Sequence, residues 1–444
     1  MEHRLRLRCA PGLLLSLSLG GAAQAQIAVA TPISAEVEAG HARLLASPLL
    51  KQVLAGLQAD DARALADLKA LTEIPAPPFK ERARAEAFLA LLRAHGLPEA
   101  AMDGEGNVIG LRKGSGQGPL LVVSAHLDTV FPEGTDVTVK EHDGRLYAPG
   151  ISDDTRGLAV LISWLEVLNK NQVQTVGDLM FVGDVGEEEL GNLRGMKALF
   201  RDHPQIDGLV GLEPGEGNGV ITVGTGSHRY EVLFHGPGGH SFMAFGLPSA
   251  IHAMGRAIAK IGDVRTPSEP KTTFTVGTVS GGTSVNTIAG EARMAVDIRS
   301  NAMPMLLEAE EKIMVAVAAG AAEENQRWDS DKISVQTRLI GDRPAGNTPA
   351  RSIIVQAALR SIAASGKTPL LMSASTDANL PMSLGIPAII LGSGGKTGGF
   401  HARDEWFDPR GAWEGAQTAL TTVLALVGVQ GISEPMLARR TPRP

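Results

Sequence analysis

The chain has 444 residues, of which 43% are hydrophobic and 20% charged, and its formal net charge is −7. This composition is typical of a globular protein with a large core, and the length exceeds that of one compact domain. Because the chain is acidic and has no run of lysines and arginines, we expect no nucleic-acid partner.

The first 25 residues have the three-part layout of a secretory signal peptide. An arginine-bearing start is followed by an apolar segment at 13–19 and by the small-x-small site Ala23-Gln24-Ala25. The apolar segment is far shorter than the ~20 residues that span a bilayer. We therefore predict a signal peptide at 1–25, a periplasmic or secreted protein, and no membrane association after cleavage. The single cysteine, Cys9, lies in this leader, so the mature chain would carry no thiol.

Helical and strand patterns alternate along the first half of the mature chain. Residues 33–97 have apolar side chains at helical spacing, interrupted by the breaker PAPP. Strand patterns follow in GPLLVVSAHLDTV, DLMFVGDV and DGLVGLEP, separated by helical patterns in LAVLISWLEVLNK and NLRGMKALFRDH. This alternation predicts an α/β domain with a mainly parallel sheet covered by helices.

The pattern changes near Gly226 and returns near Asn347. Between them the order is β-α-β-β-α-β, which is typical of a small split βαβ sandwich with helices on one face of its sheet. We predict a main domain made of residues 26–225 and 344–444, with a smaller α+β domain inserted at 226–343.

Acidic residues and histidines gather where the predicted strands end. G-x-S-x-G and H-E-x-x-H are absent, and the GGKTGG stretch lacks the first glycine of a phosphate-binding loop because Ile390 stands there. The candidates are instead His126 and Asp128, Asp153 and Asp154, Glu187 to Glu189, Glu213, and His401. Asp154 alone is best interpreted as an ordinary helix N-cap. Taken together, two imidazoles and three carboxylates at the carboxyl edge of one sheet suit a pair of divalent cations.

In this order the motifs resemble those of the dizinc metallopeptidase family that includes carboxypeptidase G, aminoacylase, peptidase T and succinyl-diaminopimelate desuccinylase. The landmarks are H-x-D, G-x-x-D-D, the double Glu, E-P, G-x-x-H-S, the Asn of SVNTI and the late His. Two departures are Gly186 before the acids with a third Glu after them, and Thr155-Arg156-Gly157 where the family usually has Lys-Gly. The resemblance implies that residues 226–343 form a lid and dimerisation domain, that the protein is a homodimer, and that it holds two Zn²⁺, with Co²⁺ or Mn²⁺ as alternatives.

The resemblance also implies roles for individual residues. The implied metal ligands are His126, Asp153 as the bridging ligand, one acid of the double Glu, Glu213 and His401. The implied catalytic residues are Asp128 as the partner of His126, the preceding acid of the double Glu as general base, and His240, a lid histidine that reaches the partner subunit's site in dimeric members. Asn286 and Arg299 match lid positions that contact substrate.

The three consecutive glutamates allow two registers. Counting back from Gly191 makes Glu188 the base and Glu189 the ligand, whereas counting forward from Gly177 makes Glu187 the base and Glu188 the ligand. We favour the second register, because the sheet fixes the strand length while the turn after it can absorb one residue.

The predicted function is an exported metal-dependent hydrolase, an exopeptidase or deacylase that cleaves an amide bond in a small peptide or N-acyl amino acid with metal-activated water. One alternative is a non-catalytic metal- or peptide-binding protein on the same fold. A second alternative is a structural exported protein whose acids are solvated.

Overall fold

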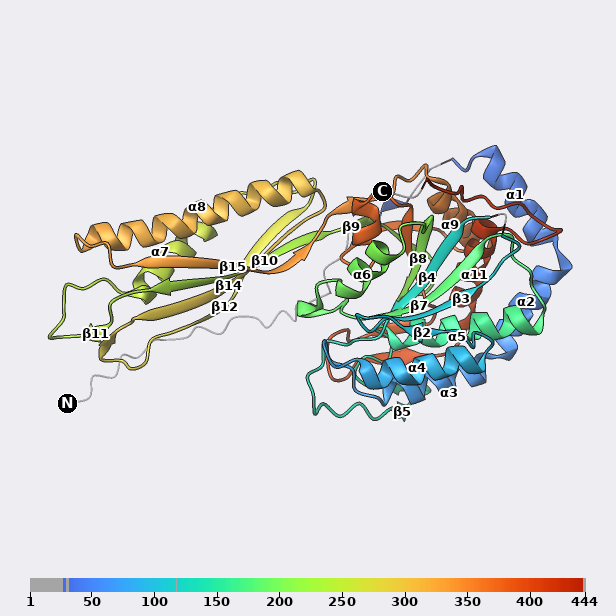
Figure 1. Cartoon of the computed structure of the whole chain (residues 1–444), viewed down its shortest axis with the longest axis horizontal. Helices are drawn as coiled ribbons and strands as arrows, with labels where there is room; N and C mark the ends of the chain where they lie inside the picture. Colours follow the sequence, from blue (N-terminus) through green and yellow to red (C-terminus); the bar gives the residue numbers. More distant parts are fainter. Residues whose placement is uncertain (1–26, 29–31, 117, 442–444) are drawn as a thin grey trace, which may run out of the picture.

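The computed structural model describes residues 27–28, 32–116 and 118–441. The predicted signal peptide, its cleavage site after Ala25 and Cys9 lie outside the described residues. Figure 1 shows a large rounded unit and an elongated inserted unit, which contains residues 226–343 and projects from the large unit. Among the described helices, none is both long and apolar enough to cross a membrane.

The large unit is built on a ten-stranded sheet in the order β1-β17-β9-β18-β8-β4-β7-β3-β2, with β16 also paired to β9. The neighbours β18, β8, β4 and β7 run parallel, whereas β3 and β2 are antiparallel additions at one edge. The predicted fold class is therefore confirmed at the centre of the sheet. The strands are β1 (Ile27–Ala28), β2 (Ala101–Met102), β3 (Val108–Arg112), β4 (Leu120–His126), β7 (Asp178–Asp184), β8 (Gly208–Glu213), β9 (Gly219–Gly224), β16 (Gly346–Asn347), β17 (Leu370–Ala374) and β18 (Ala388–Gly392).

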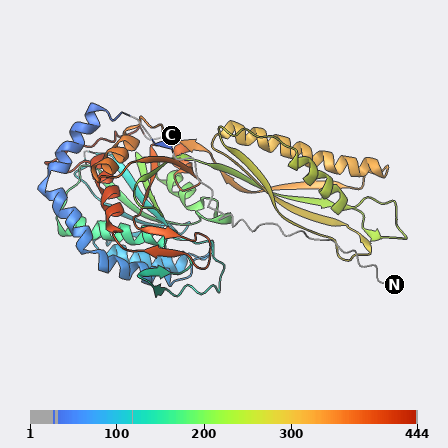
Figure 2. The same ribbon diagram turned by 180° about the vertical axis from the view of Figure 1, so that it is seen from behind.

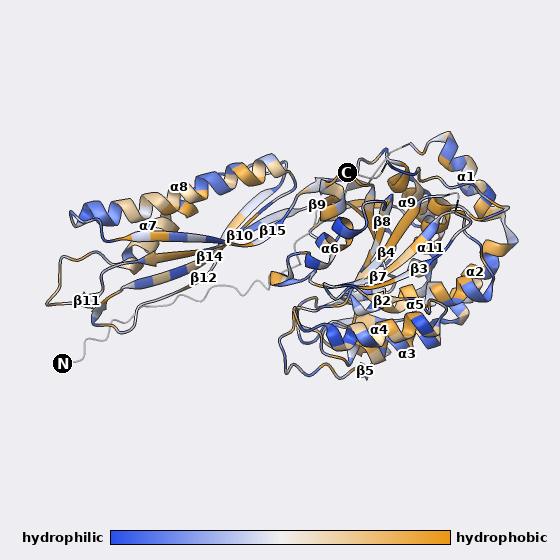
Figure 3. Cartoon of the chain, viewed as in Figure 1, coloured by the Kyte–Doolittle hydropathy of each residue, from blue (hydrophilic) through white to orange (hydrophobic). Residues whose placement is uncertain are grey.

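Helices cover both faces of this sheet because its central strands are apolar on both sides. In β4, Val123 packs into the core on one face and Val122 into the core on the other. Figure 3 shows β4, β7 and β8 as predominantly hydrophobic, as expected for buried parallel strands. The helices of the unit are α1 (Ala35–Ala46), α2 (Pro48–Ala59), α3 (Asp61–Thr72), α4 (Arg82–Ala94), α5 (Thr155–Lys170), α6 (Arg194–Asp202), α9 (Ile353–Ala364), α10 (Asn379–Ser383) and α11 (Trp413–Val427).

The two chain segments of the large unit share one core. The N-terminal helices α1 and α2 lie beside the C-terminal helices α9 and α11 (Figure 2). Trp164 of α5 is fully buried, and its indole N–H donates to the main-chain oxygen of Ala416 in α11 at 3.1 Å. A small sheet, in the order β19 (Lys396–Gly398), β20 (Trp406–Asp408), β6 (Arg145–Tyr147) and β5 (Lys140–His142), also joins the two segments.

The inserted unit has the predicted β-α-β-β-α-β order. Its elements are β10 (Gly226–His235), α7 (Ala250–Gly262), β12 (Thr272–Gly281), β14 (Glu291–Ser300), α8 (Met303–Arg327) and β15 (Ser334–Arg343). The sheet order is β12-β14-β10-β15, and α7 and α8 pack on one face of it around Phe234, Met294 and Ile313. A short ribbon of β11 (Gly239–His240) and β13 (Thr287–Ile288) lies at the end far from the large unit (Figure 1).

One buried side chain joins the two places where the chain passes between the units. The amide nitrogen of Asn379 donates to the main-chain oxygens of Thr225, at 2.8 Å, and of Pro344, at 3.0 Å. Thr225 directly precedes β10, and Pro344 directly follows β15. Asn379 is fully buried in the large unit, so the base of the inserted unit is fixed to the large sheet.

Candidate metal centre

The candidate residues converge at the carboxyl edge of the large sheet. His126 ends β4, Glu213 ends β8, and Glu187 and Glu188 follow β7, which lies next to β4. Parallel neighbours end at the same edge, so these side chains meet there. Loops add Asp153, from the turn before α5, and His401, from between β19 and β20.

Asp153 lies between the two histidines. One of its carboxylate oxygens, Oδ1, is 3.0 Å from Nε2 of His126, and the other, Oδ2, is 3.3 Å from Nε2 of His401. Glu188 approaches the same nitrogen of His401 to 3.2 Å. Two groups of ligand atoms, each within 4.8 Å of one another, therefore share Asp153: His126 with Glu213, and Glu188 with His401.

The donor set suits two divalent cations. Two imidazoles and three carboxylates supply the nitrogen and oxygen ligands that zinc and related ions prefer. Burial raises the pKa of Glu213 well above its usual value, and the carboxylates of Asp153 and Asp154 raise it further. Hydrogen bonds to Asp153 and Glu188 raise the pKa of His401 to about 10. Such crowding of carboxylates is the electrostatic environment that bound cations would relieve.

Asp128 organises the glutamate turn through its carboxylate. Oδ1 accepts the main-chain N–H of Gly186 and of Glu187, each at 3.1 Å, and Oδ2 accepts that of Glu188 at 2.8 Å. The carboxylate of Asp128 was expected to bond Nδ1 of His126, but it stays 3.7 Å away. Nδ1 instead lies 3.0 Å from the main-chain oxygen of Asp128. The physical reason is that the three N–H donors already occupy the carboxylate.

Of the three consecutive glutamates, two are buried and one is exposed. Glu187 and Glu188 are buried, whereas Glu189 is exposed and has a left-handed backbone with φ 46°. This is the arrangement expected when the turn, not the strand, absorbs the additional residue.

Asp154 has the helix-capping role expected of it. Its carboxylate accepts the N–H of Gly157 in the first turn of α5 at 3.2 Å, and also the N–H of His126 at 3.3 Å. Asp154 thus holds the start of α5 against the end of β4.

The sequence did not identify Glu405, which orders the Asp153 turn. One oxygen of its buried carboxylate accepts the N–H of Ser152 at 2.8 Å and that of Asp153 at 3.0 Å, and the other accepts the N–H of Gly150 at 3.1 Å. Burial raises the pKa of Glu405 to about 7. The sequence shows only that Glu405 lies four residues after His401, which does not relate it to Asp153, 252 residues earlier.

Arginines of the inserted unit line a cavity together with residues of the candidate centre. A cavity of about 430 Å³ is lined by metal-centre residues and by Arg229, Arg299 and Arg343. Arg229 and Arg299 share the carboxylate of Asp297, at 3.1 Å and 2.7 Å from their Nε atoms. Of the three lid residues named from the sequence, Arg299 is thus brought to the centre.

His240 and Asn286 are not brought to the centre of their own chain. His240 lies in β11 of the distal ribbon (Figure 1), and Asn286 directly precedes β13. The N–H of Ser241 donates to the main-chain oxygen of Asn286 at 3.0 Å. His240 is exposed, and its Nδ1 accepts the N–H of Phe242 at 3.2 Å.

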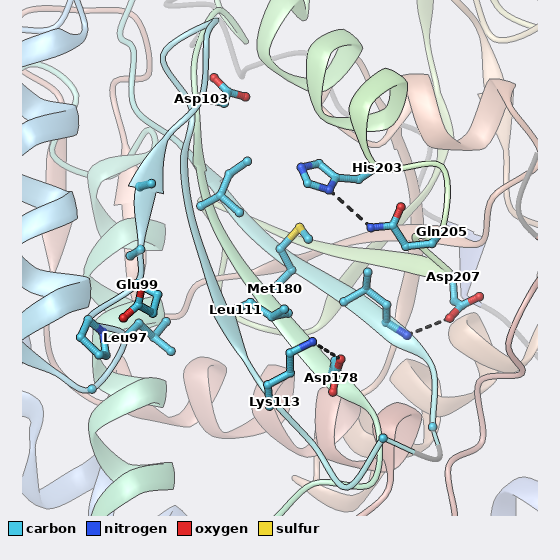
Figure 4. Close-up of a pocket in the computed structure, with 18 of the residues that line it drawn as sticks. Leu97, Glu99, Asp103, Leu111, Lys113, Asp178, Met180, His203, Gln205 and Asp207 are labelled. Carbon is cyan, nitrogen blue, oxygen red and sulfur yellow. Dashed lines mark hydrogen bonds and ion pairs between the residues drawn. The ribbon is translucent and has the colours of Figure 1, made fainter.

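A larger cavity of about 660 Å³ lies at the opposite end of the strands (Figure 4). It is lined by the first residues of β4 and β7, Leu120 and Asp178. Two of its acidic side chains bond to residues of its own wall: Asp178 pairs with Lys113 at 3.5 Å, and Asp207 accepts the N–H of Leu120 at 2.8 Å. The candidate ligands Asp153, Glu188 and His401 line the smaller cavity at the carboxyl edge and not this one, so the smaller cavity is the candidate site.

Known proteins are similar to this chain in sequence or in fold. Peptidase family M20/M25/M40 matches residues 122–425. Acetylornithine deacetylase of Myxococcus xanthus is 27% identical over 308 residues, which cover 65% of this chain and 76% of that protein. The aminopeptidase PepT of Bacillus cereus has a similar fold, with a TM-score of 0.68, 21% identity, and coverage of 82% of this chain and 98% of that one. The YXEP protein of Bacillus subtilis, described as a dinuclear metal-binding peptidase of the M20 family, has a TM-score of 0.62, 16% identity, and coverage of 84% of this chain and 100% of that one.

The family match spans more than half of the chain. The chain is therefore a member of peptidase family M20/M25/M40 and a hydrolase of the peptidase and amidohydrolase type.

Proposed function

We propose that the chain is an exported dinuclear metal hydrolase that cleaves an amide bond in small peptides or N-acyl amino acids. The observation that carries this proposal is the position of Asp153, whose two oxygens face the two histidines His126 and His401. One carboxylate placed in this way is the arrangement that a bridging ligand requires.

The proposed ligands divide into two sets that share Asp153. His126 and Glu213 complete the first set, and Glu188 and His401 complete the second. When bound, the two cations supply Lewis-acid activation of the scissile carbonyl and of the attacking water. Glu187 takes the proton of that water and delivers it to the leaving nitrogen, as a general base that becomes a general acid.

The cleft favours a substrate with a carboxylate group. Arg229 and Arg299 share the one carboxylate of Asp297, so this trio has an excess positive charge facing the cavity. A guanidinium with free N–H groups binds a carboxylate through paired hydrogen bonds. We therefore place the free carboxylate of an N-acyl amino acid or of a peptide C-terminus beside Arg299.

The proposed homodimer would bring the distal ribbon of one subunit to the centre of the other. His240 and Asn286 lie far from their own centre (Figure 1), so a role at a metal site requires a second copy. The turns next to the ribbon also expose the large apolar side chains of Phe242, Met243 and Val285. Burial of these side chains against a second subunit would stabilise the dimer.

Export rests on the predicted signal peptide at 1–25. It is tested by expressing the full chain in a bacterial host and sequencing the N-terminus of the periplasmic protein. A new terminus after Ala25 is expected, and an intact cytoplasmic chain would contradict export.

A substrate panel tests the proposed function. Purified protein is assayed with Zn²⁺, Co²⁺ or Mn²⁺ against dipeptides, tripeptides, N-acyl amino acids, and the same compounds as carboxamides. We expect hydrolysis of carboxylate-bearing substrates, and a higher KM for them in Arg299→Gln. Arg293→Gln is the control, because Arg293 lies on the same strand, is exposed and pairs with Glu231. Bound metal without hydrolysis of any member would instead indicate a binding protein.

A further inference from the structure

We propose that Arg343 is a positioning residue that holds the carboxylate of Glu187 in place for catalysis and links it to the base of the inserted unit. This inference rests on the proposed function, in which Glu187 is the general base. Arg343 ends β15, so it belongs to the inserted unit, whereas Glu187 belongs to the large unit.

The guanidinium of Arg343 contacts Glu187 at two points. Its Nη1 donates to the carboxylate oxygen Oε1 at 2.9 Å, and its Nη2 donates to the main-chain oxygen of the same residue. Nη1 also lies 3.3 Å from the hydroxyl oxygen of Ser375. A planar guanidinium that binds the backbone and the side chain of one glutamate restricts where its carboxylate can point.

The contact is shielded from water, which makes it persistent. The side chains of Arg343 and Glu187 are 5% and 7% exposed. Removing one partner of such a buried pair leaves an uncompensated charge, so the pair resists separation. With Oε1 held by Arg343, Oε2 remains to accept the proton of the water.

The partner of Glu187 distinguishes it from the proposed metal ligands. Glu187 also belongs to a candidate ligand group with His126 and Glu188, so proximity alone does not assign its role. Among the described ion pairs, Glu187 is joined to Arg343, whereas Asp153 and Glu188 are joined to histidines. An arginine on the carboxylate supplies the positive charge that a metal would otherwise supply, which favours the base over the ligand.

The backbone of Arg343 is fixed at the junction between the units. Arg343 pairs with Ser227 of β10, and the next residue, Pro344, accepts the amide of Asn379. The same amide binds Thr225 at the other crossing. A rotation of the inserted unit about this junction would therefore move the guanidinium and change the direction of the base.

Two other roles for Arg343 make different predictions. An arginine that binds the substrate carboxylate would affect KM, and only for substrates that have this carboxylate. An arginine that only stabilises the junction would affect folding and metal content, and its loss would add to the loss of Glu187. A positioning residue acts through Glu187, so its effect vanishes when Glu187 is already inactive.

The test combines Arg343→Lys with Glu187→Gln and uses Arg338→Lys as control. Arg338 lies on the same strand, is exposed, and pairs with Glu231 at 2.9 Å. Lysine keeps the charge at 343 but has a single donor nitrogen, so it lacks the planar fork by which Arg343 binds the carboxylate oxygen and the main-chain oxygen of Glu187 from two nitrogens. We expect Arg343→Lys to keep its metals and KM, and to lower kcat by about 10²-fold on carboxylate and carboxamide substrates alike, as a misplaced catalytic group does. In the Glu187→Gln background the same substitution should change kcat by less than about 2-fold.

Additive losses, a higher KM confined to carboxylate substrates, or loss of metal would overturn the positioning role. A crystal structure of Arg343→Lys provides a readout that does not depend on activity. The Glu187 carboxylate should leave the position it has in the wild-type crystal structure, and an unmoved carboxylate would refute the inference even in a protein with no measurable hydrolysis. Absence of hydrolysis in the wild-type protein would instead refute the proposed function, so the two failures can be told apart.

Discussion

The carboxylate of Asp128 holds the main chain of Glu188, whose N–H it accepts at 2.8 Å. Its other oxygen accepts the N–H groups of Gly186 and Glu187. Three donors on one buried carboxylate fix the backbone of the turn from which the proposed base and ligand project. The third glutamate, Glu189, follows outside this set and is exposed.

The three glutamates should differ in their mutational effects. Glu187→Gln should retain the metals and lower kcat by the ~10²–10⁴-fold typical of a lost general base. Glu188→Gln should weaken metal binding, and Glu189→Gln should be nearly silent and serve as control. Metal analysis and steady-state kinetics on the three variants decide the register. Loss of metal in Glu189→Gln with an active Glu187→Gln would shift both assignments by one residue.

Asp128→Asn should loosen the glutamate turn without removing a proposed ligand. An amide offers one acceptor oxygen where the carboxylate offers two, so at least one of the three N–H groups loses its partner. Loss of such a supporting residue typically costs about 10–100-fold in metal affinity or activity. Competition with a chelator measures the affinity. Asp136→Asn, in an exposed loop, is the control, and equal affinities in the two variants would show that the three bonds are dispensable.

A buried histidine should make stability depend on pH. Burial, with the nearby Arg360, lowers the pKa of His41 to about 4, and its Nε2 lies 3.0 Å from the hydroxyl of Ser361. Between about pH 4 and the unfolded pKa of about 6.5, His41 is protonated in the unfolded chain but stays neutral in the folded chain. The free energy of unfolding should therefore fall as pH drops from about 6.5 to about 4, by up to ~3 kcal/mol from this group.

Urea unfolding at a series of pH values measures this dependence. His41→Gln should lose this part of the slope, while the exposed His142→Gln should keep it. Identical slopes in wild type and His41→Gln would contradict the assignment.

Mixing two different inactive variants should restore activity if they form heterodimers. If His240 acts in the partner subunit's site, mixing inactive His240→Ala with inactive Glu187→Gln should form heterodimers with one intact site. Refolding the two variants together and assaying the mixture measures the recovery, with each variant refolded alone as control. A fully active monomer, shown by light scattering of the assayed sample, would rule out this role.

The sequence predicted the buried strands, from their apolar runs, and the candidate residues at the strand ends. Apolar runs such as those of β4 and β8 identify buried parallel strands, and their last residues, His126 and Glu213, lie at the carboxyl edge of the sheet. The antiparallel edge strands β2 and β3 were not predicted, because short strands with mixed burial give a weak pattern.

The sequence did not predict contacts between residues that lie far apart along the chain. Glu405 binds a turn around Ser152, and Arg343 binds Glu187 from the other unit, yet each residue lies in an ordinary surface-like stretch of sequence. No local spacing relates such pairs, since only the fold brings them together. For the same reason, the exposed His240 could be named from its motif but not placed at a metal site.

Metal reconstitution tests the central claim most directly. Protein stripped by a chelator is titrated with Co²⁺ while its visible absorption and its hydrolysis of an N-acyl amino acid are recorded. The account predicts an inactive stripped protein, and activity and absorption that both saturate at two equivalents per chain. In His401→Ala, which lacks a proposed ligand of one site, tight binding should fall to one equivalent. Full activity in the stripped protein, or saturation of wild type at one equivalent, would contradict a dinuclear centre at Asp153.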